Sequence, residues 1–164
     1  MSPTNFDRMV ELAEEYFGAK SDPEQLAVNQ DIIIRLKDLH PMAVTERSTE
    51  NGPVAWILVI PTTRLLMRQF VSGSAGERQL FEKTIPGGKF ECLYLCSALV
   101  LPEFRGKGLA LAATMEAVTG IRRDHPLTSL CVWEFSPEGR RLAETVARMS
   151  CLPMYIRTVS SHRH

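Results

Sequence analysis

The stretch that decides the fold is residues 94–118, YLCSALVLPEFRGKGLALAATMEAV. Its first eight residues are almost all apolar, which is typical of a buried strand. Pro102 ends that run, because proline has no N–H to donate to a strand ladder. Gly106 and Gly108 then precede a run whose apolar residues recur at helical spacing as far as Arg122. The stretch therefore predicts a strand, a glycine turn and an amphipathic helix in direct succession.

The glycine turn, Arg105-Gly-Lys-Gly108, has the composition of an anion site. Its two glycines let the backbone turn tightly and leave its amides unshielded. The first N–H groups of the following helix have no intrahelical acceptor, and the helix dipole places partial positive charge beside them. Arg105 and Lys107 add full positive charges. A pyrophosphate is the ligand that this arrangement predicts.

Two common phosphate loops do not match the turn. A P-loop needs a lysine and then a serine or threonine after its second glycine, whereas Gly108 is followed by Leu109 and Ala110. The dinucleotide-binding fingerprint needs a third glycine where this chain has Leu111. The turn is therefore neither a P-loop nor a dinucleotide-binding turn, and an anion at this position would belong to another class of site.

The rest of the chain predicts a mixed α/β fold. Helical spacing of apolar residues predicts a helix from Phe6 to Phe17 and a second one from Pro23 to about Leu39. Asn51-Gly52 predicts a hairpin turn. Strands are expected at 42–47, 53–61, 90–101, 128–135 and 154–159, and further helices at 64–71, 77–83, 106–122 and 137–149. We expect a mixed, mostly antiparallel central sheet flanked by helices, within one domain over 1–164.

The strand, proline, glycine loop and helix together resemble a known motif. Val100-x-Pro102 followed by Arg105-x-x-Gly108-x-Ala110 is similar to motif A of the GCN5-related N-acetyltransferase (GNAT) superfamily. A second segment follows that family's pattern through Leu130, Val132, Ser136, Gly139 and Leu142. The resemblance covers about 42–159, whereas the helical segment 1–40 does not look like the family's usual opening.

The resemblance implies an acyl-CoA N-acyltransferase fold with extra N-terminal helices. It implies direct transfer of an acetyl group from acetyl-CoA to a primary amine of a small molecule or peptide. Main-chain groups would hold the pantetheine arm and the pyrophosphate of coenzyme A, with Ser136 contributed by the second segment. These expected cofactor-binding residues are Ala98, Leu99, Val100, Arg105, Gly106, Lys107, Gly108, Leu109, Ala110 and Ser136. A bulge in the strand would open the acetyl slot.

The chain departs from the family pattern at three single positions and near the end of the helix predicted at 137–149, where Met149-Ser-Cys-Leu-Pro153 replaces the family's Gly-Phe. Ser136 replaces the usual asparagine and Gly139 the usual alanine, and Ala143 stands where many members carry the tyrosine that protonates the leaving thiolate. Two alternatives therefore stay open. One is a non-catalytic acyl-CoA-binding or interaction module of the same fold. The other is a transferase for longer acyl chains, with a roomier slot around Ala98 and Met115.

Acyl transfer to an amine needs a base for the ammonium and an acid for the thiolate. Glu91, at the start of the best strand, and Glu134, near the end of the next, are the candidate bases, followed by Tyr94. Tyr155 is the candidate acid, provided that its strand returns to the cleft. Each also has a structural interpretation: a solvated charge, an outward residue of an alternating strand, and a packed tyrosine. No cation or histidine neighbours Cys96 in sequence, so direct transfer is favoured over an acyl-enzyme.

Charge and cysteine usage limit the class of protein. Lys+Arg and Asp+Glu are both 19, which excludes a generally basic nucleic-acid binder. The neutrality is a cancellation, since residues 1–82 carry −4 and residues 83–164, which contain the glycine turn, carry +4. No apolar run is long enough to span a bilayer, and the four cysteines fit no disulfide or zinc pattern. We expect a cytoplasmic protein with no metal, nucleic-acid or membrane partner; a homodimer is one state that the resemblance implies.

Overall fold

Five strands form one mixed sheet in the order β1-β2-β3-β4-β5 in the computed structural model, which describes residues 3–19, 30–133 and 136–158. The strands are β1 (Val44–Thr49), β2 (Gly52–Thr62), β3 (Cys92–Val100), β4 (Ser129–Trp133) and β5 (Met154–Arg157). The two antiparallel pairings, β1 with β2 and β2 with β3, are longer than the parallel pairings of β3, β4 and β5. The predicted fold class, a mixed and mostly antiparallel sheet flanked by helices, is confirmed.

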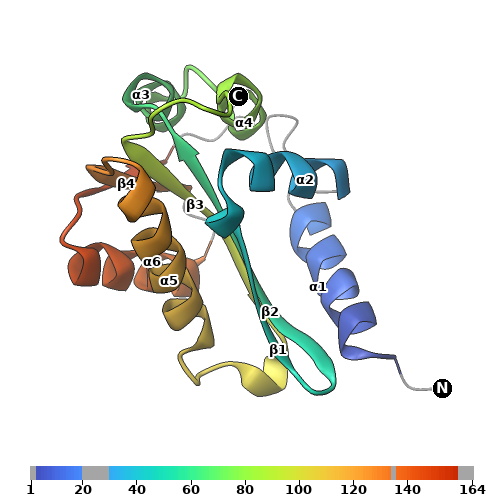
Figure 1. Cartoon of the computed structure of the whole chain (residues 1–164). Coiled ribbons are helices and arrows are strands. Elements are labelled where there is room, and N and C mark those ends of the chain that lie inside the picture. Colours follow the sequence, from blue (N-terminus) through green and yellow to red (C-terminus); the bar gives the residue numbers. More distant parts are fainter. Residues whose placement is uncertain (1–2, 20–29, 134–135, 159–164) are drawn as a thin grey trace.

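Helices cover both faces of this sheet. They are α1 (Asn5–Ala19), α2 (Gln30–Leu39), α3 (Arg64–Ser72), α4 (Glu77–Lys83), α5 (Leu109–Asp124) and α6 (Pro137–Ser150), with short 3-10 turns η1 (Pro41–Ala43) and η2 (Pro102–Phe104). Helices α5 and α6 lie on one side of the sheet and α1 and α2 on the other (Figure 1). Helices α3 and α4 pack against the same buried cluster as α2.

Local signals place the first hairpin as predicted. Gly52 has a φ of +109°, a left-handed value that favours glycine, and Thr49 pairs with it across the turn. The preceding strand begins at Val44 and not at Met42, because Pro41–Ala43 form η1 instead. The N–H of Met42 donates to Nδ1 of His40 at 3.0 Å and so caps that turn. Pro23, residues 134–135 and Val159 lie outside the described residues.

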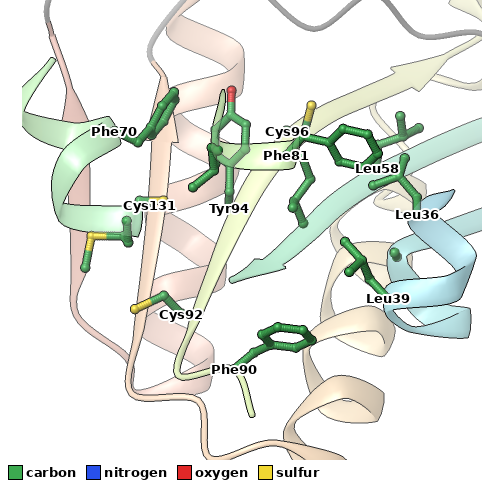
Figure 2. Packing of buried hydrophobic residues seen from close by; sticks show 14 residues of the cluster. Leu36, Leu39, Leu58, Phe70, Phe81, Phe90, Cys92, Tyr94, Cys96 and Cys131 are labelled. Atoms are coloured by element: carbon green, nitrogen blue, oxygen red, sulfur yellow. The ribbon is translucent and has the colours of Figure 1, made fainter. Parts of the chain in front are cut away.

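The core divides into clusters on the two faces of the sheet. Cys92, Tyr94 and Cys96 of β3 face α2, α3 and α4, as Figure 2 shows for this cluster. Leu93 and Leu95 face α5 and α6. Such alternation along β3 follows from the two-residue period of a strand and leaves both faces of the sheet buried.

The alternation of β3 is reversed by a bulge at Cys96. Ser97 pairs with Leu58 and Leu95 pairs with Val59, so Cys96 stands opposite no residue of β2. Beyond it, Ala98 packs with the α5 and α6 cluster, whereas Leu99 packs with α1. A bulge bends its own strand and disturbs the ladder next to it.

Strands β3 and β4 separate beside the bulge. Their register ends at Tyr94 and Cys131, although β4 continues for two more residues paired with β5. The edge of β3 that faces β4 therefore has no partner strand from Leu95 to Val100 among the described residues. This divergence opens the sheet on one side of the bulge.

Candidate functional site

A cavity of about 570 Å³ lies where β3 and β4 diverge. Its walls include all of Leu95–Val100 and come from both sides of the sheet: Tyr16 of α1 and Trp133 of β4 on one, Ala110 of α5 and Leu142 of α6 on the other. Small-molecule sites in proteins are usually concave spaces of about 300–1,000 Å³ with mostly apolar walls. The divergence thus creates a ligand-sized space centred on the bulge.

The glycine turn lies at one end of this cavity and leaves open space above its backbone. Gly106 and Gly108 have φ values of +78° and +77°, and a Cβ added at either would meet no atom within 4 Å. Only glycine adopts such backbone angles without strain. The predicted turn is therefore present, and no side chain of the described residues fills the space over its two glycines.

Helix α5 begins directly after the turn with donors that no side chain caps. Gly108 is its N-cap and supplies no capping side chain. The N–H of Ala112 donates to the carbonyl of Gly108 at 3.0 Å, so the amides of Leu109, Ala110 and Leu111 precede the first intrahelical donor and have no acceptor within the helix. No acidic residue lies in the first turn. The dipole of this 16-residue helix therefore presents unopposed positive charge to the cavity.

Arg105 joins the turn to the open edge of β3. Its Nε donates to the carbonyl oxygen of Val100 at 2.9 Å, and the side chain lines the cavity. Lys107 lies with its Nζ 6.0 Å from the centre of the Phe104 ring. The free amides at the start of α5, the two open glycines and the guanidinium of Arg105 suit a pyrophosphate. The edge of β3 beside them suits an extended arm attached to that pyrophosphate, and coenzyme A has this shape.

Helix α6 supplies the other side of the cavity through its first turn. Ser136 is the N-cap, and its Oγ accepts from the N–H of Gly139 at 3.0 Å. A Cβ at Gly139 would lie 3.1 Å from that oxygen, so glycine here suits the short serine cap. Ala143, which stands where the resemblance implies a tyrosine, is buried and also lines the cavity.

Two of the three predicted acid–base residues lie away from this cavity. Glu91 is at the opposite end of β3, where its Oε1 accepts from the N–H of Arg64 at 3.1 Å and so caps the start of α3. Tyr155 is 47% exposed on β5. Neither is among the cavity-lining residues, and Glu134 lies outside the described residues. The geometry gives Glu91 a capping role and leaves Tyr155 on the surface.

A buried polar cluster lies behind the bulge, and it joins Tyr94 and Cys96 to Glu77, which the sequence did not single out. Glu77, at the start of α4, has no exposed surface. Its Oε2 accepts from the hydroxyl of Tyr94 at 2.5 Å and from the thiol of Cys96 at 3.7 Å. Burial, reinforced by Glu77 and Cys96, raises the pKa of Tyr94 well above its ordinary value. Burial with the nearby Cys96 and Glu77 likewise raises the pKa of Tyr16, so both hydroxyls stay protonated.

The sequence held no signal for Glu77, because an acidic residue in the first turn of a short helix is normally solvated. Among the described residues, no group of three potential ligand side chains could hold a metal ion. The described helices include none that is long and apolar enough to cross a membrane.

Comparisons with known proteins give matches at the level of solved structures alone. No protein-family model matches the chain, and no curated protein matches it. A tetramutant of the BH1408 protein from Bacillus halodurans matches with a TM-score of 0.48 and 11% identity, covering 100% of this chain and 95% of that one. An integron cassette protein from the mobile metagenome of Cole Harbour Salt Marsh has a TM-score of 0.40 and 17% identity, over 99% and 84%. A Corynebacterium glutamicum protein described as histone acetyltransferase HPA2 and related acetyltransferase has a TM-score of 0.41 and 19% identity, over 90% and 84%.

Proposed function

We propose that the protein is an acyl-CoA-dependent N-acyltransferase that moves an acetyl group from acetyl-CoA directly to a primary amine. The observation that carries this proposal is the divergence of β3 from β4 at the Cys96 bulge, beside a helix start with two open glycines. Together they border a cavity with an uncapped helix start at one end and, along its side, a strand edge that no strand of the described residues covers.

Coenzyme A would use main-chain groups for most of its contacts. The pyrophosphate would accept from the amides of Arg105–Ala110, with the Arg105 side chain beside it. The pantetheine arm would pair with the free edge of β3 from Leu95 to Val100, as an added strand does. That arrangement leads the thioester to the bulge, and a main-chain N–H near Leu99 would donate to the developing oxyanion.

The reaction needs no acyl-enzyme. The amine nitrogen forms a bond to the acyl carbon, the carbon–sulfur bond breaks, and the sulfur leaves as coenzyme A thiol after taking a proton. The nitrogen loses one proton as the amide forms, and that proton replaces the one that the sulfur has taken from its donor. An acceptor that arrives as an ammonium releases one further proton to solvent. Tyr16 is the one tyrosine among the cavity-lining residues, and it replaces Tyr155 as the proposed donor to the leaving sulfur.

A non-catalytic acyl-CoA-binding module of the same fold is the second candidate. The presence of Ala143 in the cavity wall favours it, because the family's usual proton donor is then missing from α6. Both candidates bind coenzyme A, and the enzyme alone releases thiol in the presence of an amine. They are therefore separable by experiment.

Binding of coenzyme A measured by calorimetry, and thiol release from acetyl-CoA over a panel of amines, test the proposal together. Gly108→Glu places a carboxylate over the anion site, and we expect it to weaken coenzyme A binding by at least roughly tenfold. Gly87→Glu is the matched control, because Gly87 has a φ of +90° and the same open space outside the cavity. Unchanged binding in Gly108→Glu contradicts the cofactor site. Binding without thiol release with any amine supports the module instead.

All four cysteines are free thiols, and Cys92, Cys96 and Cys131 are buried. Thiols persist in a reducing compartment, and this supports a cytoplasmic location within the proposal.

A further inference from the structure

The cavity has two halves, one on each face of the sheet. Its charged lining residues are Arg105, which precedes α5, and Glu138 and Arg140 of α6. Helices α5 and α6 lie on one face of the sheet, whereas α1 lies on the other (Figure 1). The charged walls and the glycine turn therefore belong to the half that the proposed function gives to coenzyme A.

The other half, which we call the α1 half, has apolar and aromatic walls. Leu58 and Cys96 belong to the buried cluster on that face of the sheet (Figure 2), and Leu99 packs with α1. Further walls on this face are Leu12, Tyr16 and Trp133. Burial is the largest cause of the raised pKa of Tyr16, so the α1 half is poorly solvated. Within the described part of the chain, no charged side chain lines it.

Ser97 places an unpartnered hydroxyl in the α1 half. The residue lines the cavity and is 8% exposed, and its buried Oγ has no hydrogen-bond partner among the described residues. Ser97 pairs with Leu58 across β2 and β3, and paired side chains of antiparallel strands lie on the same face of a sheet. The bulge at Cys96 thus turns Ser97 toward α1, away from the half that contains the glycine turn.

A buried hydroxyl without a partner costs stability, and a ligand that supplies the partner offsets this cost. A serine oxygen moves between staggered positions by rotation about χ1, so it can meet a ligand group in the adjoining cavity. The oxygen of Ser97 can accept from an N–H of a primary amine. The lone pair of the amine nitrogen then stays free to attack the acyl carbon.

We propose that the α1 half is the acceptor site, that it takes primary amines with an apolar alkyl or aromatic body, and that Oγ of Ser97 accepts a hydrogen bond from their nitrogen. The inference rests on the proposed function and specifies its acceptor. An apolar surrounding favours the neutral form of an amine, which is the form that attacks the thioester. A second charge on the acceptor would lose its hydration against the leucine and aromatic walls, and this loss costs binding energy.

Three probes with the same six-carbon chain test the class of acceptor: hexylamine, 1,6-diaminohexane and 6-aminohexanoate. Their dissociation constants are measured by calorimetry on protein saturated with coenzyme A, and their KM values by thiol release from acetyl-CoA. We expect hexylamine to be favoured over each of the other two by at least roughly tenfold. 2-Phenylethylamine should bind as well as hexylamine, because the walls include aromatic rings.

Ser97→Ala tests the contact with the nitrogen. We expect it to weaken hexylamine binding by roughly fivefold, to leave coenzyme A affinity unchanged, and not to lower the midpoint of thermal unfolding. Ser129→Ala is the matched control, since Ser129 is a buried strand serine outside the cavity whose Oγ lies 3.0 Å from Sγ of Cys92. That variant should bind hexylamine like the wild type and unfold at a temperature lower by roughly 2–4 °C.

Equal or tighter binding of 1,6-diaminohexane or 6-aminohexanoate by the wild type overturns the inference and needs no variant. Unchanged hexylamine binding in Ser97→Ala overturns it as well, and so does a loss of thermal stability as large as that in Ser129→Ala, because the hydroxyl then has a structural role. Failure of the proposed function has a different signature. In that case no amine releases thiol, while the binding preference for hexylamine and its loss in Ser97→Ala are still measurable.

Discussion

Arg8 in α1 and Glu103 in η2 form a forked ion pair, with Nη1 2.7 Å from Oε2 and Nη2 2.7 Å from Oε1. The pair joins the N-terminal helix to the segment just before the glycine turn. Because Leu12 and Tyr16 of the same helix line the cavity, this fork helps to hold one cavity wall in place. Its energy is modest, since the two side chains are partly or largely exposed and screened by water.

Acid is expected to loosen α1. The hydrogen bonds and charge of Arg8 lower the pKa of Glu103 from 4.5 to about 2. A carboxylate whose folded pKa is depressed stabilises the fold above its unfolded pKa, and the contribution is lost as the pH falls from about 4.5 to about 2. Hydrogen exchange of α1 amides, expressed as protection factors, should show this loss in the wild type and not in Glu103→Gln. Equal acid sensitivity of the two proteins would rule out the role of the fork.

His125 is expected to give the fold a pH dependence near neutrality. Partial burial and then the nearby His40 lower its pKa below 6.5, against a smaller opposite effect of Asp124. Its Nδ1 accepts from the N–H of Phe90 at 3.3 Å, which also favours the neutral ring. Between its folded pKa and 6.5 the unfolded chain binds more protons, so the free energy of unfolding rises with pH in that window.

Urea unfolding at several pH values between 5 and 8 measures this dependence. We expect the wild type to lose stability as the pH falls below about 6.5, and His125→Asn, which retains an acceptor, to lose less. Parallel curves for the two proteins would mean that other groups control the dependence.

Tyr16 and Tyr155 are expected to respond differently to loss of their hydroxyls. Tyr16 lines the cavity, whereas Tyr155 is exposed on β5. If Tyr16 donates to the leaving sulfur, Tyr16→Phe should lower kcat by roughly tenfold or more and leave coenzyme A affinity unchanged. Tyr155→Phe is the control and should match the wild type. The opposite ranking would restore Tyr155 as the acid.

Arg157 is expected to be a strong determinant of stability. It is fully buried, donates to two carbonyl oxygens and packs against two aromatic rings. Arg157→Met leaves both carbonyls without that donor, and we expect it to cost about 2–4 kcal/mol in the free energy of unfolding. Arg148→Met, at an exposed position of α6, should change it by less than about 0.5 kcal/mol. Denaturant titrations compare the two, and similar small changes would contradict the expectation.

The elements that the sequence predicted well depend on local chemistry. Asn51-Gly52 specifies its turn through backbone angles that glycine tolerates. The strand, turn and helix of residues 94–118 are contiguous, so their order needs no knowledge of distant contacts. The positive φ values of Gly106 and Gly108 follow from the same local reasoning.

The acid–base residues required information that a linear pattern lacks. Glu91 adjoins β3 in sequence, which makes it a candidate base, yet about five residues of extended chain, or about 16 Å, separate it from the bulge. Glu77 was not a candidate, because only the packing of α4 against β3 brings it to Tyr94 and Cys96. The end of a strand that borders a cavity is decided by where the adjacent strands of the sheet separate. This separation depends on tertiary structure, so a linear pattern of residues does not reveal it.

The bulge at Cys96 also limits which insertions and deletions the chain can accept. Every residue of β3 after Cys96 faces the side opposite to the one that simple alternation would give, so Ala98 and Leu99 suit their clusters only with the extra residue present. Deleting one residue between Tyr94 and Val100 would exchange the two faces for the rest of the strand. We therefore expect insertions and deletions to be tolerated in the surrounding loops and selected against between Tyr94 and Val100. In this segment the number of residues should be more constrained than their identity.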